Sequence, residues 1–483
     1  MNKQTKIVAT ISDLNCEVDF IQSLFNEGMN VVRINSAHTT FEGASKVVAN
    51  VRQVSSAIAI LIDTKGPEIR TTEIACGAMV VAQGDKVELG GCDGNSCVST
   101  LASATGVHKL FVNDKDITSN VPVGSCVLID DGDIELKVVG RNGDALMCEV
   151  SNCGVIKSHK SVNVPGVDIN LPSLTPRDTE YIHWAVDNDL DFIAHSFVRT
   201  KQDLIDIQAI LDARGSHIKI ISKIENQQGV DNIDEILDHC YGVMVARGDL
   251  GVELPAEEIP VTQRALVRKC IESKKPVIIA TQMLHSMICS PRPTRAEVSD
   301  IANAIYQRVD AIMLSGETAS GQYPVEAVRT MATVAARIEQ EVKPIEDINM
   351  VRINNEITAQ LSRSAVRAST NLPIKAIVVD TLTGRTARYL AAFRGSKPVY
   401  SLCYRKHVMR ELALSYGVYA EYGEPLIAHD RFTYQMLVRL ERAGTLSATD
   451  LVIVLGGSFG AARGASYMEI SKVIHLINKS LID

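Results

Sequence analysis

The sequence predicts an α/β protein: a (β/α)8 TIM barrel with an inserted all-β lid domain and a C-terminal α/β domain. Three observations favour this fold. Eight short apolar runs, rich in β-branched residues, each precede an amphipathic helical segment. A long section of short runs broken by Gly, Asp and Asn separates the third run from the fourth. Beyond residue 343, strand and helix patterns alternate again.

The eight runs of the barrel are almost continuously apolar, which is typical of parallel strands that are buried on both faces. Segments such as RDTEYIHWAVDND and RAEVSDIANAIYQRV lie between them and have the spacing of helices that cover a sheet. The expected barrel comprises residues 1–66 and 166–342. We predict its strands at 6–11, 30–35, 57–64, 191–197, 218–225, 242–248, 276–282 and 310–316.

The inserted section, 67–165, contains short strand-like runs such as SCVLIDDGDIELKVVG, broken by Gly, Asp and Asn. This spacing predicts a small all-β domain. Because the section leaves the barrel at the carboxyl end of a strand, we expect it to cover the barrel mouth as a lid.

The final section, 343–483, predicts an α/β domain. It contains a helical pattern in EITAQLSRSAVRAST. Its strand-like runs lie at 375–380, 398–403, 450–457 and 471–477.

The composition is that of a soluble globular protein, with 483 residues, 46% hydrophobic and 22% charged, and a net charge of −8. Since no long basic run is present, nucleic acid is not the expected partner. The start, MNKQTKIVATISD, lacks an apolar signal region, and no stretch reaches the ~18 apolar residues of a membrane span. A cytoplasmic protein without membrane contact is expected.

Six of the eleven cysteines fall in the inserted section. Two pairs have C-x4-C spacing, but no CxxC or neighbouring His pair supports the alternative of a zinc site. We interpret them as free thiols in a reducing cytosol. They are Cys76, Cys92, Cys97, Cys126, Cys148 and Cys153.

Polar residues follow seven of the eight predicted barrel strands. The carboxyl ends of barrel strands meet at one mouth, where polar side chains usually serve chemistry. One such residue would often be structural, but a set of this size indicates an active site. The set is Arg33, Asn35, Asp63, Thr64, Lys65, Ser196, Arg199, Lys223, Glu225, Arg247, Gly248, Asp249, Thr281, Gln282, Ser315 and Glu317.

Lys223 and Glu225 are two residues apart on one predicted strand, so their side chains share a face. A salt bridge at the strand end is the simpler interpretation. However, Asp249 on the next strand adds a second carboxylate, and a carboxylate pair suits Mg2+. Lys223 supplies a cation for developing negative charge, and Arg33 offers a guanidinium fork to a phosphate. This combination predicts phosphoryl-transfer or enolate chemistry.

Several long motifs resemble the pyruvate kinase family: GMNVVRIN, IDTKGPEIR, SKIEN, GVMVARGDLGVELP, ATQMLHSM, RPTRAEVSDIANAI and LSGETASGQYPVEAV. They occur in the order of that family, and the three-part layout covers essentially the whole chain. The resemblance implies transfer of the phosphoryl group of phosphoenolpyruvate to ADP, which yields ATP and pyruvate. It also implies a cytoplasmic homotetramer that uses Mg2+ (or Mn2+) and K+.

By this resemblance, Glu225 and Asp249 bind the divalent metal. Lys223 stabilises the phosphoryl group in flight, and Thr281 helps to deliver a proton to the enolate. The remaining roles are substrate binding by Arg33, Ser196, Gly248 and Asp249, K+ binding by Asn35, Asp63 and Thr64, phosphate contact by Arg33 and Arg70, and nucleotide binding by His38, Lys160, Asn35 and Arg70. An ordinary surface histidine and a solvated lysine are the alternatives for His38 and Lys160.

The chain departs from the family pattern at three positions. RINSAHT replaces RLNFSHG, so a cation-binding serine becomes Ala37. His285 stands where Glu is usual, and Ser161 stands where Gly is common and would stiffen the lid. Glu68 is kept, and in the family a glutamate here accompanies dependence on potassium. We therefore expect potassium to be required but held more weakly.

The segment VVDTLTGRTARYL places hydroxyl and N–H groups between a strand and a helix, where they can bind phosphate. Simple capping by threonine is the alternative. Family effector sites for sugar phosphates use this loop and a glycine-rich one that GGSFGAARGAS, 456–466, resembles. The candidate effector residues are Thr381, Thr383, Gly384, Arg385 and Thr386.

Two other functions remain open. A dikinase-like barrel also uses phosphoenolpyruvate, but it needs a phosphohistidine partner and lacks the inserted β domain. A catalytically weak paralogue could act as a sugar-phosphate sensor. The presence of Lys223, Glu225, Asp249 and Thr281 argues against this second alternative.

Overall fold

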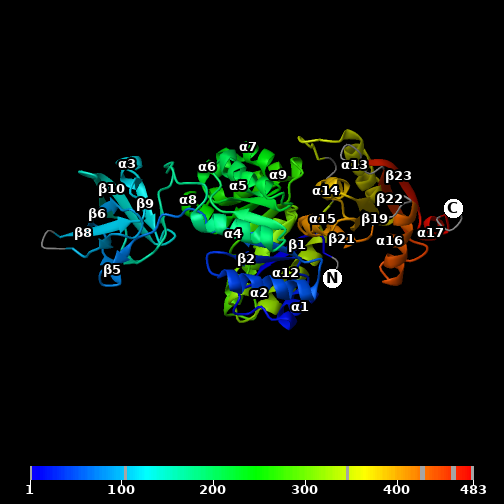
Figure 1. Cartoon of the computed structure of the whole chain (residues 1–483), viewed down its shortest axis with the longest axis horizontal. Helices are drawn as coiled ribbons and strands as arrows, with labels where there is room; N and C mark the ends of the chain where they lie inside the picture. Colours follow the sequence, from blue (N-terminus) through cyan, green and yellow to red (C-terminus); the bar gives the residue numbers. More distant parts are fainter. Residues whose placement is uncertain (1–2, 103–105, 344–347, 425–429, 458–463, 480–483) are drawn as a thin grey trace.

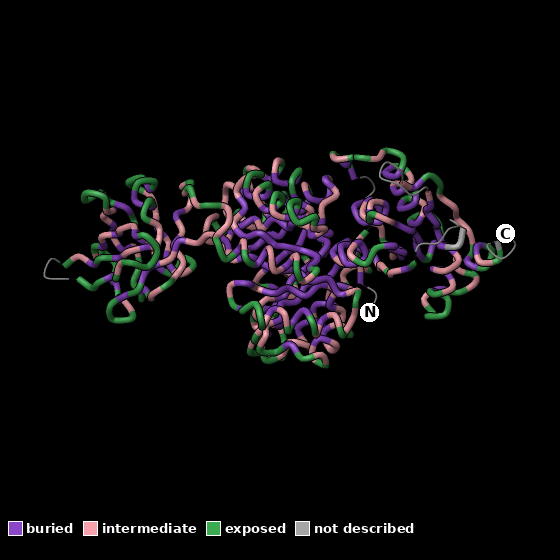
Figure 2. Tube along the Cα trace, viewed as in Figure 1, coloured by how far each residue is buried: buried purple, intermediate pink, exposed green. Residues whose placement is uncertain are grey.

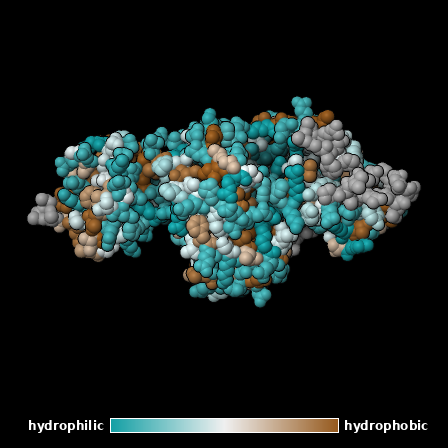
Figure 3. Space-filling view, viewed as in Figure 1, coloured by the Kyte–Doolittle hydropathy of each residue, from teal (hydrophilic) through white to brown (hydrophobic). Residues whose placement is uncertain are grey.

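The computed structural model describes residues 3–102, 106–343, 348–424, 430–457 and 464–479. Three bodies follow one another along the long axis of the molecule (Figure 1). An all-β body lies at one end, the barrel lies in the middle, and an α/β body lies at the other end. The face seen in Figure 3 is mainly hydrophilic, with apolar residues scattered over it.

The barrel is closed, and its strands pair in parallel in the order β1-β18-β17-β16-β15-β14-β3-β2. Each of the eight predicted strands is confirmed, although each is one to three residues shorter than predicted, at one or both ends. The strands are β1 (Lys6–Thr10), β2 (Val31–Asn35), β3 (Ala59–Asp63), β14 (Phe192–His195), β15 (Lys219–Ile224), β16 (Gly242–Ala246), β17 (Val277–Ala280) and β18 (Ala311–Leu314).

Helices surround this barrel, and Figure 2 shows that the residues of its strands are mostly buried. Reciprocal capping boxes at Thr175, Thr200 and Thr294 fix where three of the helices begin. The helices are α1 (Val18–Asn26), α2 (Phe41–Val54), α4 (Pro176–Asp187), α5 (Lys201–Ala213), α6 (Gln227–Asp231), α7 (Ile233–His239), α8 (Arg247–Glu253), α9 (Glu258–Glu272), η1 (His285–Ile288), α10 (Arg295–Tyr306), α11 (Gly316–Ala319) and α12 (Pro324–Glu339).

The inserted body, called the lid below, has its own apolar core, as predicted for an all-β domain. A six-stranded sheet has the order β13-β9-β10-β11-β6-β8, and two further pairs are β12-β5 and β4-β7. The elements are β4 (Glu73–Ile74), β5 (Ala78–Val81), β6 (Lys86–Gly91), β7 (Val98–Ser99), β8 (Val107–Val112), α3 (Ile117–Asn120), β9 (Cys126–Ile129), β10 (Ile134–Asn142), β11 (Ala145–Val150), β12 (Gly154–Lys157) and β13 (Val162–Asn163).

Cys92 and Cys97 form a disulfide in the lid, so their interpretation as free thiols is wrong. The two residues flank the short loop between β6 and β7, and their Cα atoms are 6.2 Å apart, within reach of a disulfide. The other four lid cysteines carry free thiols. In the described part of the chain, no group of three or more His, Cys, Asp or Glu side chains is arranged to hold a metal ion.

The C-terminal body is a five-stranded sheet in the order β21-β20-β19-β22-β23, in which β23 alone is antiparallel to its neighbour. The predicted strand at 471–477 is wrong, because β23 ends at Lys472 and helix α17 follows. The elements are α13 (Glu356–Asn371), β19 (Ile374–Thr381), α14 (Arg385–Ala392), β20 (Val399–Cys403), α15 (Lys406–Glu411), η2 (Leu412–Leu414), β21 (Val418–Tyr422), α16 (Asp430–Arg442), β22 (Leu451–Gly457), β23 (Ala465–Lys472) and α17 (Val473–Lys479).

Buried ion pairs attach the C-terminal body to the amino end of the barrel. Arg394 donates to Asp310, directly before β18, with one Nη1–Oδ1 distance of 2.9 Å. Arg410 pairs with Asp191, directly before β14. The C-terminal body therefore lies opposite the barrel mouth. Among the described helices, none is both long and apolar enough to cross a membrane.

Candidate active site

A cavity of about 460 Å3 opens between the carboxyl ends of the barrel strands and the lid. Because nine of the sixteen predicted strand-end residues line it, the convergence expected from the sequence is largely observed. Its lining residues are Arg33, Asn35, Ala37, His38, Asp63, Thr64, Lys65, Glu68, Arg70, Asn95, Asn113, His159, Ser196, Phe197, Lys223, Glu225 and Asp249.

Lys223 is the central cation of this cavity. Its Nζ lies 2.9 Å from Glu225 Oε1 and 3.1 Å from Asp63 Oδ1, and it donates to Ser196 Oγ at 2.7 Å. Burial acts to lower the pKa of Lys223, but the carboxylates of Asp63 and Glu225 outweigh it and hold the pKa above its usual value. The ammonium group is therefore charged and points into the cavity.

Asp63 is a buried carboxylate with two cationic partners. Arg33 donates to it from Nε at 2.7 Å and also donates from Nη1 to Thr10 Oγ1 at 3.0 Å. Burial acts to raise the pKa of Asp63, but Arg33 and then Lys223 outweigh it and hold the pKa below its usual value. Arg33 thus lines the cavity with its guanidinium held in place by Asp63 and Thr10.

Glu225 and Asp249 face the cavity from the ends of the adjacent strands β15 and β16. Glu225 Oε2 accepts a hydrogen bond of 2.6 Å from the Phe197 N–H. Burial raises the pKa of both carboxyls, and the neighbouring charge of Asp249 adds to this effect on Glu225. Glu225 is buried and Asp249 is half-buried. Two neighbouring carboxylates that repel each other fit a divalent cation such as Mg2+, which takes few protein ligands and keeps several waters.

Neutral and anionic oxygens collect beside Asp63. Asn35 Oδ1 accepts from the Ala37 N–H at 3.1 Å, and the Thr64 carbonyl accepts from Ser196 Oγ at 2.6 Å. These oxygens fit a monovalent cation, while Ala37 contributes none from its side chain. Ser36 Oγ is buried and has no hydrogen-bond partner in the described structure.

Thr281 follows β17 with a φ of 70°, a left-handed conformation that is rare for a β-branched residue and concentrates at functional sites. Its Oγ1 accepts from the Gly248 N–H at 2.8 Å, and its carbonyl accepts from Arg247 at 2.7 Å. In this structure the Gly248 N–H is therefore bonded to Thr281. Neither Thr281 nor Gly248 lines the 460 Å3 cavity.

Some predicted strand-end residues serve the framework instead. Arg247 forms an ion pair with Asp300 at 2.6 Å. Glu317 is buried and accepts from the N–H groups of Ser315 at 2.8 Å and Leu284 at 3.1 Å. These contacts order the loops after β16, β17 and β18.

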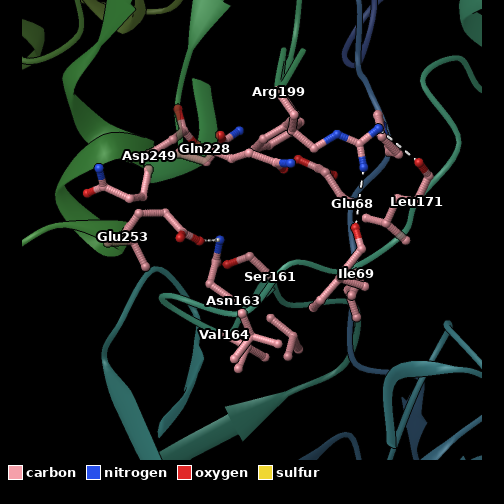
Figure 4. A pocket seen from close by; sticks show the side chains of 18 of the residues that line it. Glu68, Ile69, Ser161, Asn163, Val164, Leu171, Arg199, Gln228, Asp249 and Glu253 are labelled. Carbon is pink, nitrogen blue, oxygen red and sulfur yellow. Dashed lines mark hydrogen bonds between the residues drawn. The ribbon is translucent and has the colours of Figure 1, made fainter. Parts of the chain in front are cut away.

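A neighbouring cavity of about 750 Å3 lies between the hinge of the lid and the barrel (Figure 4). Asn163 from the hinge donates to Glu253 Oε1 of α8 at 3.2 Å across this cavity. Lys160 forms an ion pair with Asp130 at 2.7 Å. The ammonium group of this nucleotide-binding candidate is therefore already paired with a carboxylate. Asp249 lines both cavities and connects them.

The nucleotide candidates come from both the barrel and the lid. His38 is exposed on the cavity wall. Arg70 donates to Glu68 Oε2 and to the His159 carbonyl, each at 2.7 Å. The lid also contributes Asn95, Asn113 and His159, which the sequence reasoning missed because nothing local marks them as cavity residues.

The candidate effector loop lies far along the chain, in the C-terminal body. Thr381 Oγ1 accepts from the Gly384 N–H at 2.8 Å, and Gly384 adopts a φ of 73° directly before α14. Thr383 is exposed, whereas Thr386 is buried. Most of the second, glycine-rich loop, at 458–463, lies outside the described residues.

The comparisons with known proteins agree with one another. A family model described as the barrel domain of pyruvate kinase matches residues 2–328, and one described as its alpha/beta domain matches 359–471. A pyruvate kinase of Borreliella burgdorferi is 45% identical over 478 residues, which cover 98% of this chain and 98% of that relative. One of Geobacillus stearothermophilus is 41% identical, covering 99% of this chain and 82% of the relative.

A solved structure supports the same assignment. The crystal structure of a pyruvate kinase from Cryptosporidium parvum has a TM-score of 0.90 and 32% sequence identity, covering 98% of this chain and 96% of that one. Both the relatives and the fold thus extend over barrel, lid and C-terminal body. The chain belongs to the pyruvate kinase family.

Proposed function

We propose that this chain is an active pyruvate kinase that transfers the phosphoryl group of phosphoenolpyruvate to ADP, giving ATP and pyruvate. The observation that carries the proposal is the position of Lys223 Nζ, within 3.1 Å of both Asp63 and Glu225 in a cavity that Asp249 also lines. A charged ammonium group beside a carboxylate pair suits a reaction in which a phosphoryl group, with negative charge spread over its three outer oxygens, moves between two oxygens.

Glu225 and Asp249 would hold Mg2+ or Mn2+, which when bound supplies positive charge that offsets the charge of phosphate oxygens. Lys223 is placed to stabilise the phosphoryl group during transfer. Arg33 binds and orients the phosphate of the substrate, and Ser196 positions the Lys223 ammonium through its 2.7 Å hydrogen bond. The backbone N–H groups of Gly248 and Asp249 receive the substrate carboxylate once Thr281 gives up its bond to Gly248.

The second half of the reaction adds a proton to the enolate left after phosphoryl transfer. Thr281 is the candidate positioning group, since its hydroxyl lies at the carboxyl end of β17 next to α8. The strained backbone of Thr281 supports this role, because a φ of 70° aims the side chain in a direction that ordinary strand geometry does not give.

The nucleotide and monovalent cation complete the proposed site. His38, Arg70, Asn35 and Lys160 are the nucleotide candidates, and Lys160 must leave Asp130 to reach a phosphate. We propose K+ as the second cation, held by Asn35, Asp63 and the Thr64 carbonyl. The unpartnered Ser36 hydroxyl is one neutral oxygen close by in sequence that a small rearrangement could add.

The regulatory proposal concerns the loop of Thr381, Thr383, Gly384, Arg385 and Thr386. Its compact turn before α14 supports binding of a phosphorylated sugar effector. Titration of sugar monophosphates and bisphosphates against subsaturating phosphoenolpyruvate tests it, with Thr383→Glu as the variant that adds a repelling charge. No shift with any compound, and a silent Thr383→Glu, would reduce the loop to a capped helix.

We further propose a cytoplasmic homotetramer divided into domains at 1–66 and 166–342 for the barrel, 67–165 for the lid and 343–483 for the C-terminal unit. The experiment that tests the function is a lactate-dehydrogenase-coupled assay with phosphoenolpyruvate, ADP and Mg2+. Formation of pyruvate that depends on ADP supports the proposal. A folded protein that binds sugar phosphate but forms no pyruvate would favour the sensor alternative instead.

A further inference from the structure

A separate cavity of about 520 Å3 lies between the amino end of the barrel and the C-terminal body. The barrel contributes residues at the starts of β15, β16 and β17, and the C-terminal body contributes residues from α14, from α15 and from the loops before these helices. The cavity therefore lies at the end of the barrel opposite the active site. None of its lining residues lines either of the two cavities at the mouth.

Basic side chains outnumber acidic ones in the lining. Five lysine and arginine side chains face two carboxylates there. The apolar remainder of the wall, which includes Ile218 and Val408, would suit the carbon skeleton of a small molecule. The five cations are Lys219, Lys274, Lys275, Arg388 and Arg405.

The two carboxylates do not balance these cations. Asp238 already forms an ion pair with Arg352, with an Nε–Oδ1 distance of 2.5 Å. Arg352 itself does not line the cavity. Glu411 is shared, since its oxygens lie 3.6 Å from Lys219 Nζ and 3.7 Å from Arg388 Nη1. Both distances exceed a normal hydrogen bond, so each cation retains capacity for a closer anion.

The remaining cations have no carboxylate partner within 4.0 Å among the described residues. Lys274 Nζ contacts Asn354 Oδ1 at 3.1 Å and lies 3.8 Å from the centre of the Tyr389 ring. Lys275 Nζ donates to the Cys240 carbonyl. The Arg405 guanidinium makes no hydrogen bond or ion pair with any described residue.

Burial and neighbouring positive charges lower the pKa values of two of these lysines, Lys274 and Lys275. Burial lowers the pKa of Lys274 to about 8, and the positive charges of Arg388 and Lys275 add to the effect. The pKa of Lys275 is lowered by burial too, again with Arg388 among the contributing charges. Like charges that destabilise one another inside a partly closed cavity indicate that a bound anion would relieve the repulsion.

We propose that this interdomain cavity binds a small phosphate monoester. Guanidinium groups bind phosphate oxygens in a fork, and lysines add point charges. The volume exceeds what a bare phosphate ion needs, and the apolar wall accommodates the remainder of a phosphorylated metabolite. Lys219, Lys274, Lys275, Arg388 and Arg405 hold the phosphate, and Glu411 gives up its two distant cations to it.

This site is distinct from the effector loop, although the two are neighbours. Leu382 and Thr383 of that loop line the cavity, but the rest of its wall is formed by barrel residues, by Asn354, by α14 and α15, and by Arg405. Substitution of Lys274 or Arg405 therefore separates the two possibilities, because neither residue belongs to the loop. The site requires no catalysis, so its failure and a failure of the proposed activity give different results.

The test is calorimetric titration of the full chain with glucose 6-phosphate at physiological ionic strength, with glucose as the uncharged control. Arg405→Gln and Lys274→Gln are the test variants. Lys406→Gln is the matched control, since Lys406 is exposed, adjacent in sequence and absent from the lining. We expect each test variant to weaken binding by about tenfold, the value of one charge-assisted hydrogen bond, and the control to change it less than twofold.

Thermal unfolding of each variant confirms that it is folded. Equal affinity in all variants would place the phosphate elsewhere and overturn the proposal, as would equal losses in the test variants and in Lys406→Gln. Absence of binding by the wild type to glucose 6-phosphate, glycerol 3-phosphate and inorganic phosphate alike would also overturn it.

Discussion

Lys223 Nζ and Glu225 Oε1 lie 2.9 Å apart at the mouth of the barrel, where β15 ends. The pair is more than a salt bridge at a strand end, because Asp63 and Ser196 hold the same ammonium group and Asp249 faces Glu225 from the next strand. The geometry places one cation against a carboxylate pair inside a cavity that a lid covers.

Replacement of this cation gives the first prediction. Lys223→Met should lower kcat by about 10²–10³, because a preorganised charge at a developing oxyanion contributes roughly 3–4 kcal/mol. The fold should survive, since methionine fills a similar volume. Steady-state kinetics and circular dichroism provide the measurement, and a variant within threefold of the wild type would remove Lys223 from the reaction.

Thr281→Ala should impair protonation of the enolate more than substrate binding. The expected signature is a fall in kcat with little change in KM for phosphoenolpyruvate, and slower exchange of pyruvate methyl protons with solvent. Thr281→Ser retains the hydroxyl that accepts from Gly248 and is the matched control. If alanine and serine behave alike, the hydroxyl has no role.

Potassium should still be required, but held weakly. Ala37 offers no side-chain oxygen, and loss of one neutral ligand costs roughly 1 kcal/mol, about fivefold in affinity. Ala37→Ser should lower the KCl concentration for half-maximal activity by about that factor. Titration of KCl against a tetramethylammonium salt at constant ionic strength measures it. Full activity without potassium or a similar ion would show that the site has been lost.

The hinge of the lid should loosen when Ser161 is replaced. Its Oγ donates to Asp131 Oδ1 at 2.7 Å and accepts from the Asp131 N–H at 3.0 Å. Ser161→Gly and Ser161→Ala both remove these bonds, so hydrogen exchange at 130–132 and 160–163 should accelerate by about fivefold for each bond lost, at roughly 1 kcal/mol per bond. Unchanged exchange in Ser161→Ala would show that the hydroxyl does not restrain the hinge.

The barrel strands were predictable because parallel strands buried on both faces leave a continuous apolar signature. The run at 471–477 was misread as a strand, since a short apolar run does not distinguish a strand from a helix. Strand β21, Val418–Tyr422, was missed because a short edge strand with polar residues gives a weak pattern.

The sequence predicted those residues of the site that lie at the carboxyl ends of barrel strands. Lys223, Glu225 and Asp63 converge because a closed barrel brings strand ends together. Asn95 and His159 were not predictable, because the placement of the lid over the mouth depends on tertiary packing. The Cys92–Cys97 disulfide was missed for a related reason, since the spacing alone does not show that the intervening loop closes.

The most direct measurement follows the phosphorus itself. Phosphorus-31 NMR of one sample containing the protein, phosphoenolpyruvate, ADP, Mg2+ and K+ reports the donor and the acceptor together. The account predicts that the phosphoenolpyruvate resonance decays as the γ-phosphate resonance of ATP grows in equal amount, and that Glu225→Gln stops both changes. Release of inorganic phosphate without ATP, or transfer that persists in Glu225→Gln at the wild-type rate, would contradict it.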